Sequence, residues 1–339
     1  MRRLMKWLFI GVIAVAALLA VAITLTVGWR PFIGPRARAL RGRSFSFERT
    51  PQRLERGRYI ATALSGCIYC HSSHEWAVPG DPIVSGTEGA GEVMPFEDLP
   101  GRIVAPNLTP DRETGAGNWS DDQFARAIRE GIGHDGRALF PMMPYQRYRD
   151  MSDEDVASVV VYLRSLPAVR HELPKTEIIF PVKYLIRDVP EPLAAPVADV
   201  TATDPAKYGA HLVNLAGCAD CHTPMLRGKN IPGMDFAGGQ VFSGPWGSVA
   251  SANLTPDPSG IPYYDEALFL EVLRTGYVKA RPLHSIMPVM VYKNLTDSDL
   301  KAMFAYLRTL KPVRHVVDNS EPVAECKLCR QKHGGGAQN

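Results

Sequence analysis

The chain lacks a strong excess of charge of either sign. Its 38 Lys and Arg residues are nearly balanced by 35 Asp and Glu residues, which gives a formal net charge of +3 over 339 residues. Nucleic-acid-binding domains usually concentrate basic residues in a patch or stripe, so the charge predicts no nucleic-acid partner. The chain also lacks the low hydrophobicity of a disordered protein, because 45% of its residues are apolar. Its length allows two compact domains with additional segments.

Cysteine is scarce, and its six residues form three pairs of the form C-x-x-C. Two of the pairs are followed by histidine: Cys67, Cys70 and His71 in the first half, and Cys218, Cys221 and His222 in the second. C-x-x-C-H is the attachment signature of c-type haem. Each thiol can bond one haem side-chain carbon, and the histidine can ligate iron from one face. A bare C-x-x-C can instead hold zinc or form a disulfide, but the repeated histidine favours two covalently bound haem c groups.

No charged residue occurs from Trp7 to Trp29, a run of 23 residues. At about 1.5 Å per residue a helix of this length spans about 35 Å, enough to cross a hydrocarbon core of about 30 Å. A cleaved signal peptide is the alternative, although its apolar core is usually only about 7–15 residues long. A small-x-small triplet at 20–22 lies inside the apolar run. We therefore expect an uncleaved transmembrane helix.

The second half of the chain repeats the first. Three pairs of segments align, namely 64–67 with 215–218, the Asn-Leu-Thr-Pro-Asp segments 107–111 with 253–257, and 162–166 with 306–310. The offset falls from 151 to 146 to 144, so the first copy has about seven additional residues. Most of them lie between its C-x-x-C-H motif and Asn-Leu-Thr-Pro-Asp, and we expect them to form a loop.

Each copy is expected to contain three helices. The first precedes the C-x-x-C-H motif and presents an apolar face. The second spans about Asp121–Glu130 in one copy and about Asp265–Thr275 in the other. Gly131 and Gly276 follow directly and are expected to end these helices, since glycine favours the left-handed conformation found there.

The third helix has the clearest periodicity. Ser152 and Thr296 are expected to cap its start in the two copies. Its apolar residues recur at i, i+3, i+4, i+7 and i+10, which is one face of a helix: Val156, Val159, Val160, Leu163 and Leu166 in one copy, and Leu300, Met303, Phe304, Leu307 and Leu310 in the other. No strand-like alternation of comparable length occurs, so the predicted fold class is all-α.

An iron held only by histidine has an open face, and methionine is the expected second ligand in an electron carrier. The first copy offers Met142 and Met143, and the second offers Met287 and Met290. With the offset of 144 set by the third helix, Met143 aligns with Met287. Each is followed by proline, which favours an extended loop. We therefore predict that Met143 and Met287 complete the two iron sites.

Other assignments remain open at this level. Met142 or Met290 can ligate in place of the aligned pair, and methionine often only fills gaps in an apolar core. His134 or His284 can also replace a methionine and lower the potential.

Two further repeated features each have two interpretations. Arg129 and Arg274 align in the second helix and can donate to a haem propionate, or they are exposed charges. The Asn-Leu-Thr-Pro-Asp segment can supply hydrogen bonds to the histidine or the propionates, or it is only a turn.

The third C-x-x-C pair, Cys326 and Cys329, is followed by Arg330 in place of histidine. Ten residues follow Cys329, so we expect no third haem module. In an oxidising compartment these thiols can form a local disulfide. A metal site that uses both thiols and His333 is the alternative, but it lacks a fourth ligand within the tail. A partner subunit or the body of the protein would have to supply one.

Together these motifs resemble a known family. Each copy is similar to the cytochrome c modules in the cytochrome subunits of bacterial membrane-bound alcohol and gluconate dehydrogenases, and in related dihaem cytochromes. The resemblance rests on C-x-x-C-H, Asn-Leu-Thr-Pro-Asp, Met-Pro-Tyr in the first copy and Tyr-Leu-Arg-Ser/Thr-Leu near each end, over about 51–171 and 205–315. It implies a small helical fold around haem, and electron passage from a periplasmic dehydrogenase toward quinone, another cytochrome or a terminal oxidase. Those dehydrogenase subunits carry three haems, whereas two motifs occur here.

The resemblance also bears on location. Arginines after the apolar run, at 30, 36, 38, 41 and 43, outnumber the basic residues before it, and counting charges alone would place the body in the cytoplasm. Large domains translocate largely regardless of such charges, and the resemblance implies haem attachment outside the bacterial inner membrane. We therefore expect a single N-terminal span with the haem domains in the periplasm.

The expected division of the chain follows from these features. It comprises a cytoplasmic tail and anchor at 1–30, a linker at 31–50, a first cytochrome c domain at 51–171, a stiff proline-rich linker at 172–204, a second cytochrome c domain at 205–315, and a C-terminal tail at 316–339.

The predicted function is electron transport, not catalysis, and no catalytic residue is assigned. The two haems would relay electrons between a dehydrogenase or other respiratory donor and a soluble cytochrome or terminal oxidase. The alternative is a dihaem redox enzyme, such as a peroxidase or a thiosulfate-oxidising cytochrome. Such an enzyme needs an open iron position or an unusual ligand, and the aligned methionines argue against it.

Overall fold

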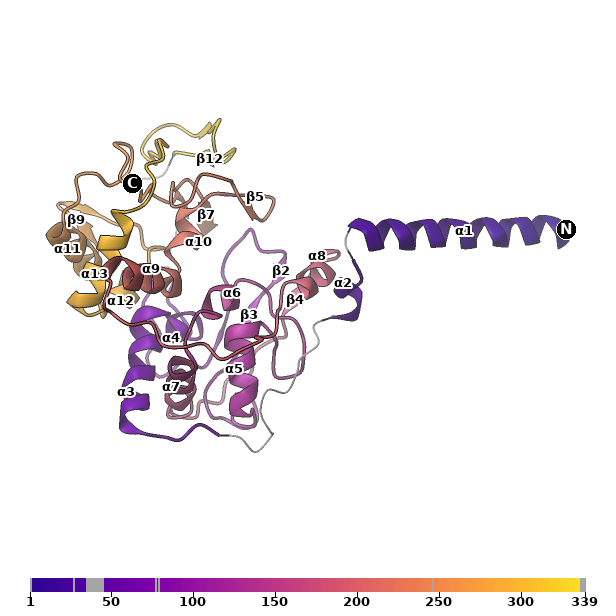
Figure 1. Cartoon of the computed structure of the whole chain (residues 1–339), viewed down its shortest axis with the longest axis horizontal. Helices are drawn as coiled ribbons and strands as arrows, with labels where there is room; N and C mark the ends of the chain where they lie inside the picture. The colour runs from indigo at the N-terminus through magenta and orange to yellow at the C-terminus, as the bar shows by residue number, and fades with distance from the viewer. Residues whose placement is uncertain are drawn as a thin grey trace.

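The structure is a computed structural model that describes residues 2–26, 28–34, 46–76, 78, 80–245 and 247–335. Helix α1 (Arg2–Thr26) projects away from the rest of the chain, as Figure 1 shows. Its mean hydropathy reaches 2.9 and none of that apolar stretch is buried. By length and composition it can cross a membrane, although a signal sequence has the same properties. The arginines at 36, 38, 41 and 43, and most of the predicted 31–50 linker, lie outside the described residues.

Helices form the framework of the rest of the chain, and the two halves repeat one arrangement. The first half contains α3 (Pro51–Tyr59), α5 (Asp121–Glu130) and α7 (Asp153–Leu163). The second contains α9 (Pro205–Ala216), α11 (Glu266–Thr275) and α13 (Asp297–Leu307). The first and third helices of each half pack against one another. The second helices begin and end within about one residue of their predicted bounds. The third helices end at Leu163 and Leu307, three residues before the last apolar positions predicted for them.

The predicted caps account for these boundaries. The side chains of Ser152 and Thr296 accept hydrogen bonds from the backbone amides three residues later, at 3.0 and 3.2 Å. Gly131 and Gly276 end the second helices with φ of 72° and 77°, a left-handed conformation that disfavours other residues. The apolar faces of both third helices are buried, as their spacing predicted.

Four shorter helices position the predicted site residues. The C-x-x-C-H motifs lie on α4 (Cys67–Cys70) and α10 (Cys218–His222). Helix α6 (Tyr145–Tyr148) follows Met143-Pro144, and α12 (Val289–Tyr292) follows Met287-Pro288. The two halves therefore place these elements in the same order.

Glycine allows the first and third helices of each half to approach closely. A Cβ atom on Gly57 would lie 1.9 Å from the Ser158 carbonyl oxygen, and one on Gly209 would lie 1.8 Å from that of Ala302. These two glycines are therefore equivalent. Cys67 follows Gly57 by ten positions, whereas Cys218 follows Gly209 by nine.

A π-helical turn accommodates the one additional residue between Gly57 and Cys67. Element η1 (Ile60–Leu64) continues α3 directly, and the Ser65 amide donates to the Ile60 carbonyl at 2.8 Å. A π turn holds one more residue than an α turn and keeps both flanking segments helical. The first motif thus has the same setting as the second despite the insertion.

Short antiparallel strands, which the all-α prediction did not include, join the helices. The longest pair is β7 (Val241–Gly244) with β8 (Gly247–Ala250). The other pairs are two residues long: β1 (Glu92–Val93) with β3 (Val104–Ala105), β2 (Gly101–Arg102) with β4 (Glu177–Ile178), β5 (Met225–Leu226) with β6 (Lys229–Asn230), β9 (Tyr277–Val278) with β10 (Arg281–Pro282), and β11 (Ala324–Glu325) with β12 (Lys332–His333). The helices still form the framework.

The segment between the halves runs along the first half. Strand β4 pairs with β2, and the Asp153 amide donates to the Val197 carbonyl at 2.9 Å. Helix α8 (Val182–Leu185) leads into a 3₁₀ turn, η2 (Ile186–Asp188), against which α2 (Arg30–Ile33) packs. The proline-rich linker therefore packs against the first half.

The two halves share one apolar core. Buried side chains from both, including Ile60, Leu64, Leu212 and Leu300, belong to a single contiguous cluster. Polar contacts also cross the junction: the Tyr59 hydroxyl donates to Asp299, the Thr296 amide donates to the Tyr59 hydroxyl at 3.2 Å, and Asn214 Nδ2 donates to Asp150 Oδ2 at 2.9 Å. This shared core fixes the two C-x-x-C-H motifs relative to one another.

Candidate functional site

The first C-x-x-C-H motif faces a cavity of about 1000 Å³. Cys67, Cys70, His71 and Met143 all contribute to its lining, so the structure brings the predicted ligands of the first half together. Apolar side chains from the second and third helices form much of the wall: Phe124, Ile128, Val159 and Leu163. The volume lies at the upper end of the range of about 300–1,000 Å³ for cofactor pockets. A large apolar cavity with a few polar groups suits a haem.

Each motif histidine is oriented by a backbone carbonyl. His71 Nδ1 lies 2.8 Å from the Pro106 oxygen, and His222 Nδ1 lies 2.7 Å from the Ala252 oxygen. A carbonyl only accepts, so Nδ1 carries the proton and Nε2 keeps the lone pair needed for a metal. Burial also lowers the pKa of both imidazoles, which favours the neutral ligand form.

The repeated Asn-Leu-Thr-Pro-Asp segment holds these carbonyls in place. Asn107 Oδ1 accepts from the Thr109 amide at 2.9 Å and hydroxyl at 2.7 Å, while its Nδ2 donates to the Val169 carbonyl at 2.8 Å. Asn253, Thr255 and Val313 repeat the pattern at 2.9, 2.8 and 2.9 Å. The segment therefore acts as a hydrogen-bonded turn, and the residue before it supplies the histidine contact.

The four motif thiols differ in exposure, since Cys70 is exposed and Cys67, Cys218 and Cys221 are partly buried. Desolvation raises the pKa of Cys67, Cys218 and Cys221 to about 12 and that of Cys70 to about 11. Each motif offers two thiols and one imidazole, one ligand fewer than a tetrahedral zinc site needs. The set thus fits thioether attachment of haem better than a zinc site.

The candidate methionines differ in their surroundings. Met143 and Met287 both pack against the buried core. Met142 also lines the cavity of the first half. Met290 is 43% exposed, and its sulfur accepts from Lys293 Nζ at 3.4 Å. The exposure of Met290 favours Met287 in the second half, whereas both methionines of the first half line the cavity. Ligation by Met143 and Met287 remains a prediction.

The two histidines near these methionines have other contacts. His134 lines the cavity and stacks on Trp119, with ring centroids 4.3 Å apart and an interplanar angle of 15°. His284 Nδ1 accepts from the Ile286 amide at 3.3 Å.

The aligned arginines of the second helix bind protein groups. Arg129 Nη1 donates to the Met151 carbonyl at 3.2 Å and to Asp153 at 2.5 Å. Arg274 donates to the Lys293 carbonyl and to Asp297. Both guanidinium groups thus tie the second helix to the start of the third. Both arginines thus have protein partners, and a contact with a haem propionate stays a prediction.

Sequence reasoning missed a pair of buried tyrosines. The Tyr148 hydroxyl donates to the Ser65 carbonyl at 2.8 Å, and the Tyr292 hydroxyl donates to the Ala216 carbonyl at 2.6 Å. Each carbonyl immediately precedes the glycine that starts a C-x-x-C-H helix, and burial raises the pKa of both phenols well above its usual value. The signal was present, because both tyrosines lie five residues after the aligned methionine.

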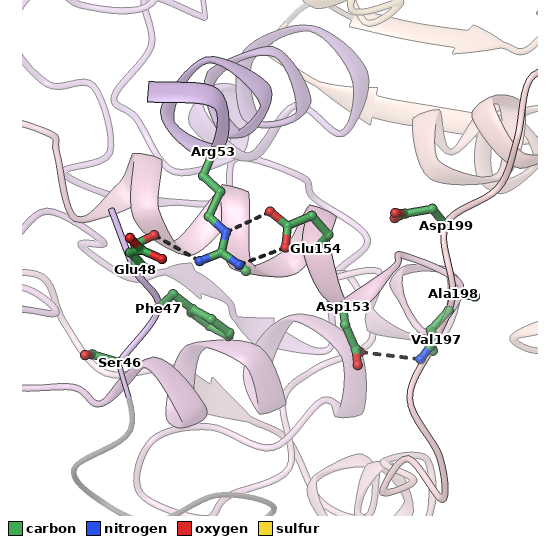
Figure 2. Close-up of a pocket in the computed structure, with 10 residues that line it drawn as sticks. Ser46, Phe47, Glu48, Arg53, Asp153, Glu154, Val197, Ala198 and Asp199 are labelled. Carbon is green, nitrogen blue, oxygen red and sulfur yellow. Dashed lines mark hydrogen bonds and ion pairs between the residues drawn. The ribbon is translucent and has the colours of Figure 1, made fainter. Parts of the chain in front are cut away.

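A second hollow, of about 640 Å³, lies away from both motifs and is shown in Figure 2. Its lining comes from the segment before α3, the start of α7 and the linker. Arg53 and Glu154 form a two-point ion pair across it, at 2.7 and 2.8 Å. The described residues that line this hollow include no cysteine, histidine or methionine, so it offers no soft metal ligand.

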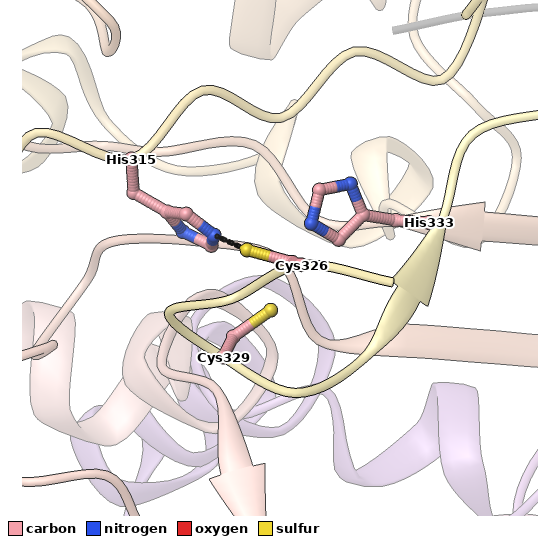
Figure 3. Close-up of side chains that lie close together, drawn as sticks. All are labelled: His315, Cys326, Cys329 and His333. Carbon is pink, nitrogen blue, oxygen red and sulfur yellow. Dashed lines mark hydrogen bonds between the residues drawn. The ribbon is translucent and has the colours of Figure 1, made fainter. Parts of the chain in front are cut away.

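The third C-x-x-C pair lies close to the histidine of the C-terminal tail. Cys326, Cys329 and His333 lie together beside His315, as Figure 3 shows. Sequence reasoning had found three of these four residues and had not identified the body residue beside them.

The fold and the paired motifs define a helical protein with a duplicated C-x-x-C-H site. Residues 54–167 and 206–311 each match the family model described as cytochrome c. These two ranges make up more than half of the chain. The chain therefore belongs to the cytochrome c family.

Several curated proteins are similar to this chain in sequence. The chain is 32% identical over 276 residues to a subunit of the nicotinate dehydrogenase of Pseudomonas putida, covering 76% of the chain and 21% of that protein. It is 28% identical to the cytochrome c subunit of the quinone alcohol dehydrogenase of Gluconobacter oxydans, covering 77% and 55%. It is also 28% identical to a dihaem c-type cytochrome of Cereibacter sphaeroides, covering 73% and 83%. The chain spans about a fifth and about half of the first two proteins.

The names of these relatives bear on the predicted class. Two of the three describe a cytochrome subunit or a cytochrome, and family membership agrees with them. The prediction that the chain is a cytochrome c is therefore confirmed.

Proposed function

We propose that this chain is a membrane-anchored dihaem cytochrome that passes electrons from a dehydrogenase to a cytochrome or a terminal oxidase. The observation that carries the proposal is the duplicated site, in which each buried C-x-x-C-H histidine is oriented by the carbonyl before Asn-Leu-Thr. The similarity to cytochrome subunits of alcohol, fructose and gluconate dehydrogenases supports the class of donor.

Two haem c groups would be held in the same way. Cys67 and Cys70 would attach the first, with His71 and Met143 as axial ligands. The second would use the equivalent residues of the second half: Cys218, Cys221, His222 and Met287. When bound, haem supplies a one-electron iron couple, and a thioether ligand raises its potential. The apolar wall of the cavity in the first half would keep water from the iron and favour its reduced state.

The junction between the halves would serve as the route between haems. The cavity of the first half extends to Asp220 and Cys221 of the second motif. Arg147 from the first half forms an ion pair with Asp220. The two attachment motifs are therefore neighbours in one rigid core, which supports direct exchange of electrons between haems.

The chain would be divided and located as its sequence predicts. Domains at 51–171 and 205–315 enclose the ranges that match the family model. Helix α1 would remain as the anchor, with the haem domains in the periplasm, where c-type haem is attached. The exposed surface of α1 supports insertion into lipid, since none of its apolar stretch packs on the protein.

Purification of the complex from its native membrane tests this proposal. We expect a dehydrogenase to co-purify in mild detergent, and two haems per chain to be reduced when its substrate is added. A matched variant, Cys218→Ala with Cys221→Ala, should retain one haem per chain. Isolation without a dehydrogenase, together with a high-spin haem that binds peroxide, would instead favour the dihaem enzyme.

A further inference from the structure

Four metal-ligating side chains converge at the C-terminus of the described chain. The ligand atoms of His315, Cys326, Cys329 and His333 all lie within 4.8 Å of one another. Figure 3 shows the two sulfur atoms and the two imidazole rings around one small space. Two thiols and two imidazoles are the donor set of tetrahedral structural zinc sites.

The second domain supplies the ligand that the tail lacks. His315 follows the third helix and is only 1% exposed. Its Nδ1 lies 2.9 Å from the Ala237 carbonyl oxygen, and its Nε2 lies 3.3 Å from Cys326 Sγ. The carbonyl fixes the proton on Nδ1 and leaves Nε2 for a metal, an arrangement typical of zinc-bound histidine.

The first half contains a matched histidine without the cysteines. His171 Nδ1 lies 3.1 Å from the Ala90 carbonyl oxygen, and its amide donates to Thr114 at 2.9 Å. The amide of His315 donates to Ser259 at 2.9 Å in the same way. The only cysteines of the first half are those of its haem motif. The repeat thus explains the orientation of His315, and only the cysteine hairpin is new in the second half.

The cysteines lie on a tight hairpin. Strands β11 and β12 pair on either side of the C-x-x-C turn, with Ala324 opposite His333. The Leu328 amide approaches Cys326 Sγ at 3.4 Å, and the Arg330 amide donates to the Cys326 carbonyl at 2.9 Å. An amide directed at sulfur stabilises a thiolate, which is the form that binds metal.

Two further observations support a ligand in this space. His333 Nε2 is buried and has no hydrogen-bond partner among the described residues. Buried polar atoms without a partner are rare and call for an explanation such as an unoccupied ion site. The Cys329 side chain is fully buried against Met234 and Ala237, which holds its sulfur inside the cluster.

We propose that His315, Cys326, Cys329 and His333 bind one structural Zn²⁺, which clips the C-terminal hairpin onto the second cytochrome c domain. Zinc suits this site because it prefers four tetrahedral nitrogen and sulfur ligands and has no redox chemistry of its own. The site has no open position for substrate, so its role is structural. Its nature is independent of which proteins exchange electrons with the haems.

The full chain, purified with both haems and without a histidine tag, provides the test. Elemental analysis should find one zinc for every two haem irons. X-ray absorption at the zinc edge should show two sulfur neighbours at about 2.3 Å and two nitrogen neighbours at about 2.0 Å. His315→Ala should reduce retained zinc by about tenfold or more after dialysis against a chelator, whereas His171→Ala should leave the zinc content unchanged.

A thiol assay covers the case in which a variant folds poorly. In the wild-type protein, Cys326 and Cys329 should resist alkylation until zinc is removed by a strong chelator, without any reductant. A disulfide between these two cysteines in the purified protein, detected as a tail peptide two hydrogens lighter, would overturn the proposal. An absence of zinc, or equal loss of zinc in His171→Ala, would also overturn it.

Discussion

Arg147 in the first half forms an ion pair with Asp220, a residue inside the second C-x-x-C-H motif. The guanidinium also lies over Gly217, where an added Cβ would be 2.7 Å from Arg147 Nη1. The aligned residue in the second half is Val291, which packs over Gly66 of the first motif. The short helix after each predicted methionine ligand thus covers the other half's attachment motif.

Replacing this arginine should alter the second haem and the exchange between haems. Arg147→Met keeps an apolar stem but removes a cation and leaves Asp220 unpaired, and both changes favour ferric over ferrous iron. At an effective dielectric constant of about 20–40 a nearby unit charge contributes roughly 1 kcal/mol, so the second potential should fall by tens of millivolts. Redox titration measures it.

Arg149→Met provides the control for this prediction. Arg149 lies on the same segment but pairs with Glu191 of the linker, at 4.0 Å. Its replacement should leave both potentials within experimental error. An equal shift in both variants would mean that net charge, not the contact with the second motif, sets the potential.

The Asn-Leu-Thr turns should be important for stability. Asn107→Ala removes four hydrogen bonds of a buried side chain and leaves the Thr109 amide without its acceptor. Unsatisfied buried groups cost about 1–3 kcal/mol each. We expect the free energy of unfolding, measured with guanidinium chloride, to fall by at least that amount. The His71 ring should also lose its fixed orientation.

Asn253→Ala provides a second, independent measurement of the same effect. It should destabilise the second half to a similar extent and perturb the haem at His222 instead. If either variant had wild-type stability and haem spectra, the turn would not be what holds the histidine carbonyl.

Glu130 should make stability depend on pH. It is 1% exposed, and its Oε1 accepts from the Leu193 amide at 3.2 Å. Burial raises the pKa of this carboxyl above its usual value, so the folded state binds the proton more tightly than the unfolded state. Stability from this group is present at acid pH and is lost as pH rises through its folded pKa. Glu130→Gln should therefore raise Tm at neutral pH and lose that advantage at acid pH.

Glu154 offers a control of opposite sign. The hydrogen bonds from Arg53 lower the pKa of this carboxyl, so its contribution is present at neutral pH and is lost as pH falls through the folded pKa. Glu154→Gln should lower Tm slightly at neutral pH, by no more than an exposed ion pair contributes. Parallel pH profiles for the two variants would contradict these assignments.

The sequence predicted those elements that local pattern determines. The third helices were found because their apolar period and their capping residues at 152 and 296 act within a few residues of one another. The second helices were found from their local pattern too, because a glycine follows the C-terminal end of each. About seven additional residues of the first half were placed mostly in a loop. A further one, before Cys67, lies in the π turn of η1, which no local signal marked.

The remaining features depend on contacts between distant segments. His315 and Cys326 meet because the C-terminal hairpin folds back onto the second domain. Arg147 meets Asp220 only because the halves share a core. The short strands were missed because pairs of two to four residues carry too little alternation to read. The alignment of the halves did carry unused information, since it would have paired Tyr148 with Tyr292.

We propose above all that each of the two haems has a histidine and a methionine ligand. Ferric haem with a thioether ligand shows a weak charge-transfer band at the red end of the visible spectrum. In the wild-type protein its intensity should correspond to two haems. It should fall by half in Met143→Ala or Met287→Ala, and should be unchanged in the controls Met142→Ala and Met290→Ala. Absence of the band in the wild type, or its loss in a control variant, would contradict ligation by Met143 and Met287.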